Sequence, residues 1–113
     1  MRFVLVTAAA LAAVLSQTPA QAGTLSARDV KAQLTGRTAS GADASGRAFV
    51  QTFAPDGAVL VKGMRVGSWS VASDGSLCQK TGARPEVCTT LENQGTAYTA
   101  SRDGQMVMTF SLK

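Results

Sequence analysis

From residue 49 onward, apolar and polar side chains alternate along the chain in a pattern that predicts β-strands. Phe49, Gln51 and Phe53 occupy one face of the first such run and alternate with the residues between and after them, because successive strand residues point to opposite sides. By this periodicity the predicted strands span residues 49–54, 58–62, 66–71, 77–79, 87–91, 96–101 and 106–112.

Residue pairs typical of tight turns separate these strands. Asp56-Gly57, Asp74-Gly75 and Asp103-Gly104 each join an Asp, which hydrogen-bonds nearby backbone, to a Gly that accepts positive φ. Their spacing predicts an up-and-down meander. The composition of residues 40–46 predicts a loop, and a change of strand parity near Gly67-Ser68 predicts a β-bulge.

Residues 23–36 precede the strands and predict a short amphipathic helix. Ser26 is a suitable N-cap, with Asp29 three residues later. Val30 and Leu34 share one face, which must dock on the rest of the domain because so short a helix is not stable alone.

The first 22 residues predict a secretory signal peptide. Arg2 supplies a positive charge, Phe3 to Leu15 is almost wholly apolar, and Ala20-Gln21-Ala22 forms a small-x-small cleavage site. A membrane anchor is the alternative, but the apolar run is shorter than the roughly 20 residues that a spanning helix needs. Cleavage would leave a single β domain, residues 23–113, without a membrane span, in the periplasm or outside the cell.

Cys78 and Cys88 are the only cysteines, and in an exported domain they predict a disulfide. A redox-active or metal-binding pair is the alternative. The spacing differs from C-x-x-C, and no His is present to complete a zinc site.

We therefore predict a mostly β fold with one disulfide and one short N-terminal helix that plugs one end. Six to eight antiparallel strands would form a small meander or barrel, either lipocalin-like or flattened into a two-layer sandwich.

No catalytic or cofactor-binding constellation stands out in the sequence. His is absent, which argues against Ser-His-Asp catalysis and His-ligated metals, and the G-x-S-x-G, P-loop and G-x-G-x-x-G motifs are also absent. We therefore predict neither an enzyme nor a cofactor or metal site. The alternative is an enzyme that uses carboxylates alone, from Asp56, Asp74 and Asp103, although turn geometry explains each of them.

Trp69 has two interpretations. It is either a core residue or an exposed aromatic that binds a partner, with Arg65 and Arg84 as its polar rim. Met106 and Met108 are either core residues or an adaptable binding surface, and their place in an alternating apolar face favours the core.

Charge gives little indication of a partner. Removing Arg2 with the signal reduces the formal net charge from +4 to +3, and the remaining charges are mixed in sign along the sequence. Nucleic-acid binding is not predicted, because that function requires clustered basic residues with aromatics between them.

Several motifs are informative when taken together: Phe53 to Gly57 (F-A-P-D-G), Gly67 to Val71 (G-S-W-S-V), Asp74 to Cys78 (D-G-S-L-C), and Cys88. In these motifs the chain resembles a group of small exported bacterial β-domain proteins of uncharacterised function. The resemblance covers nearly all of the mature chain and implies a shared fold but no functional residues. Residues 79–81 depart from the group's pattern, in which an aromatic often follows the first Cys.

These features lead to three functional hypotheses. The first is a non-catalytic binding module whose partner is an envelope or extracellular protein. A looser similarity to periplasmic inhibitor barrels gives the second, an inhibitor of a protease or lysozyme. The third is a lipocalin-like carrier of a small apolar ligand.

Overall fold

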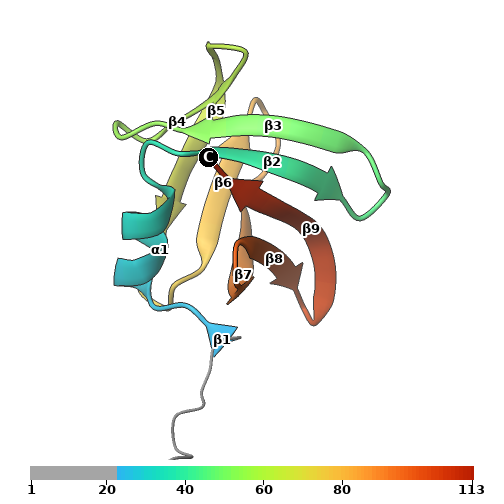
Figure 1. Ribbon diagram of the computed structural model, residues 1–113. Helices are drawn as coiled ribbons and strands as arrows, with labels where there is room; N and C mark the ends of the chain where they lie inside the picture. The colour runs from blue at the N-terminus through green and yellow to red at the C-terminus, as the bar shows by residue number, and fades with distance from the viewer. Residues whose placement is uncertain (1–22) are drawn as a thin grey trace, which may run out of the picture.

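The computed structural model describes residues 23–113, and the predicted signal peptide lies outside the described residues. The described part contains one short helix and a succession of antiparallel strands (Figure 1). The elements are β1 Gly23–Thr24, α1 Ala27–Leu34, β2 Thr38–Asp43, β3 Ala48–Phe53, β4 Ala58–Val61, β5 Met64–Val71, β6 Leu77–Thr81, β7 Val87–Gln94, β8 Ala97–Arg102 and β9 Gln105–Leu112.

Strands β2 to β9 form a closed antiparallel barrel. Each strand pairs with the next along the chain, and β2 also pairs with β9, so the first and last strands of the barrel meet. The predicted mostly β fold is thereby confirmed as an eight-stranded up-and-down barrel, and the two-layer sandwich is not adopted. Closure pairs the two strands that would otherwise be sheet edges.

Turn chemistry accounts for the hairpins. Asp103 and Gly104 have φ values of 53° and 79°, as do Lys62 and Gly63. Positive φ at both central residues is typical of the two-residue turns that match the twist of the flanking strands. The Asp103-Gly104 turn was predicted from its sequence, whereas Lys62-Gly63 was not.

The prediction that residues 40–46 form a loop is wrong for Ser40 to Asp43. These residues belong to β2, and only the β2–β3 connection that ends with Gly46 is a turn. The strand is rich in small and polar residues because it runs close to β9. A Cβ on Gly41 would lie 1.9 Å from the Thr109 carbonyl oxygen, so this close approach excludes a side chain at Gly41.

The barrel contains two irregularities in strand register. In β5, Val59 pairs with Gly67 and Leu60 with Arg65, so the extra residue is Val66, adjacent to the predicted bulge at Gly67-Ser68. In β9, Ala100 pairs with Met108 and Ser101 with Met106, which makes Val107 the extra residue.

The second bulge corrects the predicted face of β9. Met106 was expected in the core but is 45% exposed, whereas Met108 is buried. Val107 packs against the core instead. The bulge inserts one residue and thereby reverses the in-out alternation on its N-terminal side.

Helix α1 covers one end of the barrel (Figure 1). The Ser26 hydroxyl accepts a hydrogen bond from the Asp29 backbone N–H at 3.2 Å, which confirms the predicted N-cap. Val30 and Leu34 are fully buried in the barrel core. The predicted helix is too long at its start, because Gly23 and Thr24 pair with β7 as strand β1.

Aromatic side chains fill the half of the barrel beneath the helix. Phe53 and Trp69 pack edge to face with ring centroids 5.3 Å apart, and Tyr98 stacks on Phe110 at 5.2 Å. The Tyr98 hydroxyl also donates a 2.6 Å hydrogen bond to the Gln33 side chain of α1. We call this half the helix end, where the β3–β4, β5–β6 and β7–β8 turns lie.

The predicted disulfide joins two neighbouring strands. Cys78 of β6 and Cys88 of β7 are directly opposite each other in the register and are bonded. Cys78 is buried and Cys88 is exposed. The bond therefore fixes the β6–β7 hairpin and its long connection, residues 82–86, at the end of the barrel away from the helix.

Replacing both Cys78 and Cys88 with Ala is expected to lower the free energy of unfolding by about 3 kcal/mol, because an open chain of this loop length gains conformational entropy when unfolded. Urea denaturation followed by circular dichroism measures the change. The wild-type protein kept in reductant is the matched control and should have the same free energy of unfolding as the double variant. A double variant as stable as the oxidised protein would contradict this role.

Candidate functional site

The end of the barrel opposite α1 is hollowed. We call it the open end, and it is formed by the tips of the β2–β3, β4–β5, β6–β7 and β8–β9 hairpins. In an up-and-down barrel alternate connections lie at the same end, so these four tips share one end of the barrel although they are far apart in sequence.

The structure separates the three residues predicted as a binding surface. Trp69 is 8% exposed, and its indole N–H donates a 2.9 Å hydrogen bond to the Ala54 carbonyl at the helix end. Arg65 and Arg84 are exposed on the β4–β5 and β6–β7 hairpins, at the open end. Trp69 is thus a core residue away from the two arginines, and they do not form its rim.

A hollow of about 320 Å³ occupies the mouth of the barrel. We call it the mouth hollow. Gln51 donates a 3.1 Å hydrogen bond to the Gln79 side chain, and this bridge joins β3 to β6. Strands β4 and β5 lie between these two strands in the barrel wall, so the bridge crosses the interior. The residues around the hollow are Gln79, Thr81, Arg84, Pro85, Val87, Val107 and Met108.

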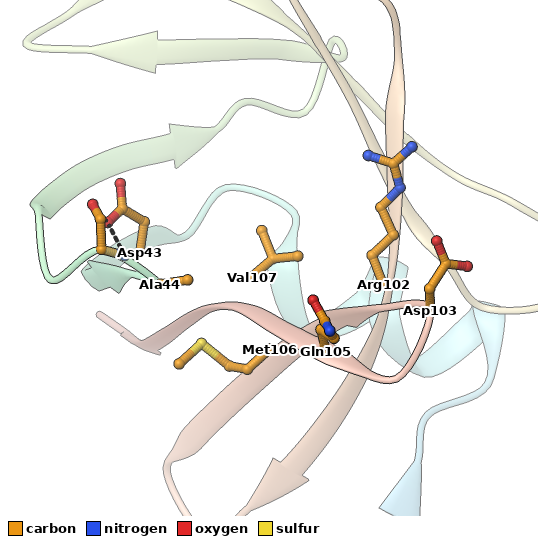
Figure 2. Close-up of a pocket in the computed structure, with 8 residues that line it drawn as sticks. Asp43, Ala44, Arg102, Asp103, Gln105, Met106 and Val107 are labelled. Atoms are coloured by element: carbon orange, nitrogen blue, oxygen red, sulfur yellow. Dashed lines mark hydrogen bonds between the residues drawn. The ribbon is translucent and has the colours of Figure 1, made fainter.

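A second, more open hollow of about 480 Å³ lies beside the first, and Val107 lines both. Figure 2 shows the loop after Asp43 on one side and Arg102 with Asp103 on the other, with Val107 between them. The Ala44 backbone N–H donates a 2.8 Å hydrogen bond to the Val107 carbonyl. The β9 bulge therefore anchors the β2–β3 loop and holds this side of the open end in shape.

Positive charge is concentrated at the open end. Its hairpins carry six basic and three acidic residues, whereas the helix end carries four of each. The net positive charge of the described chain therefore lies at the open end, which favours anionic partners there. The charged residues of the open end are Arg47, Lys62, Arg65, Lys80, Arg84 and Arg102, with Asp43, Glu86 and Asp103.

Asp43 acts within its own loop. Its carboxylate accepts hydrogen bonds from the Ser45 hydroxyl at 2.7 Å, the Ser45 backbone N–H at 3.0 Å and the Arg47 backbone N–H at 2.9 Å. These bonds, first of all the one from the Ser45 hydroxyl, and the nearby Arg47 charge hold the pKa of Asp43 below its usual value of 3.8. This carboxylate orders the β2–β3 loop.

The order of the β2–β3 loop is expected to depend on pH through Asp43. Because its folded pKa is lowered, the loop contacts are fully present above pH 3.8 and are lost as the pH falls through the lowered pKa. An NMR titration should show the Ser45 and Arg47 amide signals moving together only in acid. In Asp43→Asn the titration should disappear, whereas in Asp74→Asn, at the helix end, it should persist. Unchanged titration in Asp43→Asn would assign it to another group.

The structure does not gather the carboxylates considered for catalysis. Asp56 and Asp74 lie in turns at the helix end, where each accepts a hydrogen bond from the backbone N–H two residues later. At Asp74, the hydrogen bond from the Ser76 backbone N–H and a second one from the Ser76 side chain lower the pKa of the carboxyl group. Asp103 lies at the opposite end of the barrel, so the three residues do not share one cleft.

One group of side chains has the composition of a metal site. The Cys78 and Cys88 sulfurs and the Glu86 carboxylate lie within 4.8 Å of one another. Both sulfurs are joined in the disulfide and have no thiolate to offer, so a single carboxylate remains as a ligand. The arrangement is explained by the β6–β7 hairpin.

Sequence comparison complements this geometry. Within residues 23–113, no helix has the length and apolar character to cross a membrane. No curated protein and no solved structure matches the chain. Residues 2–108 match the family described as "Protein of unknown function (DUF995)", which spans most of the chain and includes the disulfide and the hairpins of the open end. The chain belongs to the DUF995 family of proteins of unknown function.

Proposed function

We propose that this protein is a non-catalytic binding module that recognises its partner through the open end of the barrel. The observation that carries the proposal is the coincidence of two hollows and the net positive charge on the end that α1 leaves uncovered. A rigid, disulfide-linked barrel presents such a surface in a preformed state, which reduces the entropy lost on binding.

The predicted export determines where this partner is sought. A signal peptide over residues 1–22 would deliver the domain to the periplasm or the exterior, where the disulfide is stable. The proposed partner is therefore an envelope or extracellular protein. A protease or lysozyme, as in the inhibitor hypothesis, is one class of such partner.

Charge reversal at the two ends tests the proposal. Arg84→Glu with Arg102→Glu alters the open end, and Arg28→Glu with Lys31→Glu makes the same charge change at the helix end. Each protein is cross-linked in envelope extract and its adducts are identified by mass spectrometry. We expect specific adducts to fall at least about tenfold for the open-end variant alone. Equal loss for both variants, or no specific adduct with the wild type, would contradict the proposal.

A carrier of a small apolar ligand is the second candidate, favoured by the apolar residues Val87, Val107 and Met108 around the mouth hollow. The aromatic core fills the barrel beneath this hollow, so a ligand would enter only the mouth. Val107→Phe should weaken binding of the fluorescent apolar probe anilinonaphthalene sulfonate, whereas Val66→Phe, at an exposed position of β5, should not. Equal binding by both variants would argue against the carrier.

A further inference from the structure

The barrel wall opens between β3 and β4. These strands pair only through Thr52 with Leu60 and Phe53 with Val59. The first part of β3, Ala48 to Gln51, pairs with β2 on one side and has no strand partner on the other. In Figure 1 the β2–β3 and β4–β5 hairpins extend in different directions. We call the resulting opening the wall slot.

The wall slot is large enough for an extended segment of polypeptide. Its volume is about 510 Å³. Val50, which lines it, is 55% exposed, and Phe49 is partly buried against the core. The slot therefore combines an apolar floor with a strand edge. The residues around it are Ala48, Phe49, Val50, Gln51, Val61 and Lys62.

The direction of the backbone groups in β3 can be followed from the end of the strand. The Phe53 N–H and carbonyl bond Arg37 and Gly36, on the β2 side, whereas the Ala54 N–H bonds Ala58, on the β4 side. Because these directions alternate along a strand, the backbone groups of Ala48 and Val50 point into the wall slot. An unpaired edge of this kind is a template for another strand.

Charge decides which kind of strand fits. Lys62 and Arg65 are exposed on the β4–β5 hairpin beside the slot, and residues 57–73 contain no Asp or Glu. Arg47 lies next to Ala48 at the other side. A second copy of this chain would bring the same cations against one another, whereas an acidic segment would neutralise them.

We propose that the wall slot binds an extended acidic peptide segment of a partner protein, which adds a strand to the free edge of β3. Backbone hydrogen bonds would come from Ala48 and Val50, and acidic side chains of the segment would meet Lys62 and Arg65. This mode of recognition is β-strand addition. The inference goes beyond the proposed function because it concerns the wall of the barrel and not its mouth.

Synthetic peptides test the inference. The probe is T-E-V-E-V-T with blocked ends, and its controls are T-K-V-K-V-T and the acidic peptide with alternate backbone nitrogens methylated. Hydrogen exchange of the Ala48 and Val50 amides is followed by NMR. We expect the acidic peptide to slow exchange at least about tenfold and neither control to do so, because only this probe supplies both charge and backbone partners.

Variants of the protein separate the contributions. Val50→Pro removes one edge N–H that has no strand partner in the barrel, so it should abolish binding and keep the fold. Lys62→Glu with Arg65→Glu should reverse the preference toward the lysine peptide. Arg84→Glu with Arg102→Glu, at the open end, should leave peptide binding unchanged. Circular dichroism checks that each variant is folded.

Three results would overturn the inference. The first is equal binding of the acidic and lysine peptides. The second is binding of the methylated peptide with full affinity. The third is protection of the Ala48 and Val50 amides from hydrogen exchange without any peptide. If this protection rises with protein concentration, a second copy of the chain fills the slot. If it does not, the slot is closed within one chain. None of these results bears on partner capture at the open end.

Discussion

Replacing Trp69 with Ala is expected to lower the free energy of unfolding by about 3–5 kcal/mol. The side chain is almost fully buried and packs edge to face on Phe53 beneath α1. Its removal would leave a cavity in the centre of a small core and leave the Ala54 carbonyl without its indole donor. Urea denaturation monitored by circular dichroism measures the loss.

Two further variants divide the effect into packing and hydrogen bonding. Trp69→Phe keeps an aromatic ring but lacks the N–H, so we expect it to cost about 1–3 kcal/mol. Arg65→Ala, on the same strand but exposed, should change stability by less than about 0.5 kcal/mol. A Trp69→Ala protein within about 1 kcal/mol of the wild type would show that the residue is not a core anchor.

The same variants distinguish the two interpretations of Trp69 that its sequence allowed. If Trp69 acts through the core alone, folded Trp69→Phe should retain the partner adducts of the open end. If it contacted a partner, adducts would fall without a comparable loss of stability. Its burial at the helix end supports the first outcome.

The strands predicted from the sequence are those in which large apolar residues alternate with polar ones. In β3 and β7 this alternation is largely preserved, and Phe53 and Leu91 are buried in the core. β2 carries no such signal, since the strand that closes the barrel lies too near β9 at Gly41 to carry large side chains there. The choice between barrel and sandwich depends on this strand, and so it could not be made from the sequence.

The positions of the bulges were predictable only where they disturb a regular pattern. The parity change in β5 located its bulge to within a residue. In β9 the apolar residues Met106, Val107 and Met108 are consecutive, so either of two alternations fits. The register with β8 selects the one that buries Val107 and Met108 and exposes Met106.

The candidate site could have been predicted in part. Trp69 was grouped with Arg65 and Arg84 because these residues are near one another in the sequence. Arg65 and Trp69, however, lie toward opposite ends of β5 and therefore toward opposite ends of the barrel. Once an up-and-down order is assumed, alternate hairpin tips share one end, which would have grouped Arg84 with Arg102. The mouth hollow and the wall slot depend on side-chain packing and on the splayed β3–β4 pair, and neither feature has a sequence signal.

Gly41→Ala is expected to destabilise the protein by about 3 kcal/mol or more, because it forces apart the strands that close the barrel. A Cβ at this position would lie 1.9 Å from the Thr109 carbonyl oxygen and 2.6 Å from the Phe110 Cα. Both neighbours are backbone atoms of β9, so no side-chain rotation relieves the collision. Urea denaturation measures the stability, and hydrogen exchange of the β2 amides reports whether β2 and β9 separate locally.

Gly46→Ala is the matched control, because this residue lies in the following turn with φ of 88° and open space around its Cβ position. It should lower the free energy of unfolding by only about 1–2 kcal/mol, because an alanine with positive φ is strained. The comparison separates a glycine needed for space from one needed for its backbone conformation. If Gly41→Ala is no more destabilised than Gly46→Ala, β2 does not approach β9 closely, and the closed barrel that positions the open end and the wall slot is wrong. If β2 amides exchange faster in Gly41→Ala while β6 and β7 amides do not, closure by β2 and β9 is a separate step from formation of the disulfide-linked hairpin.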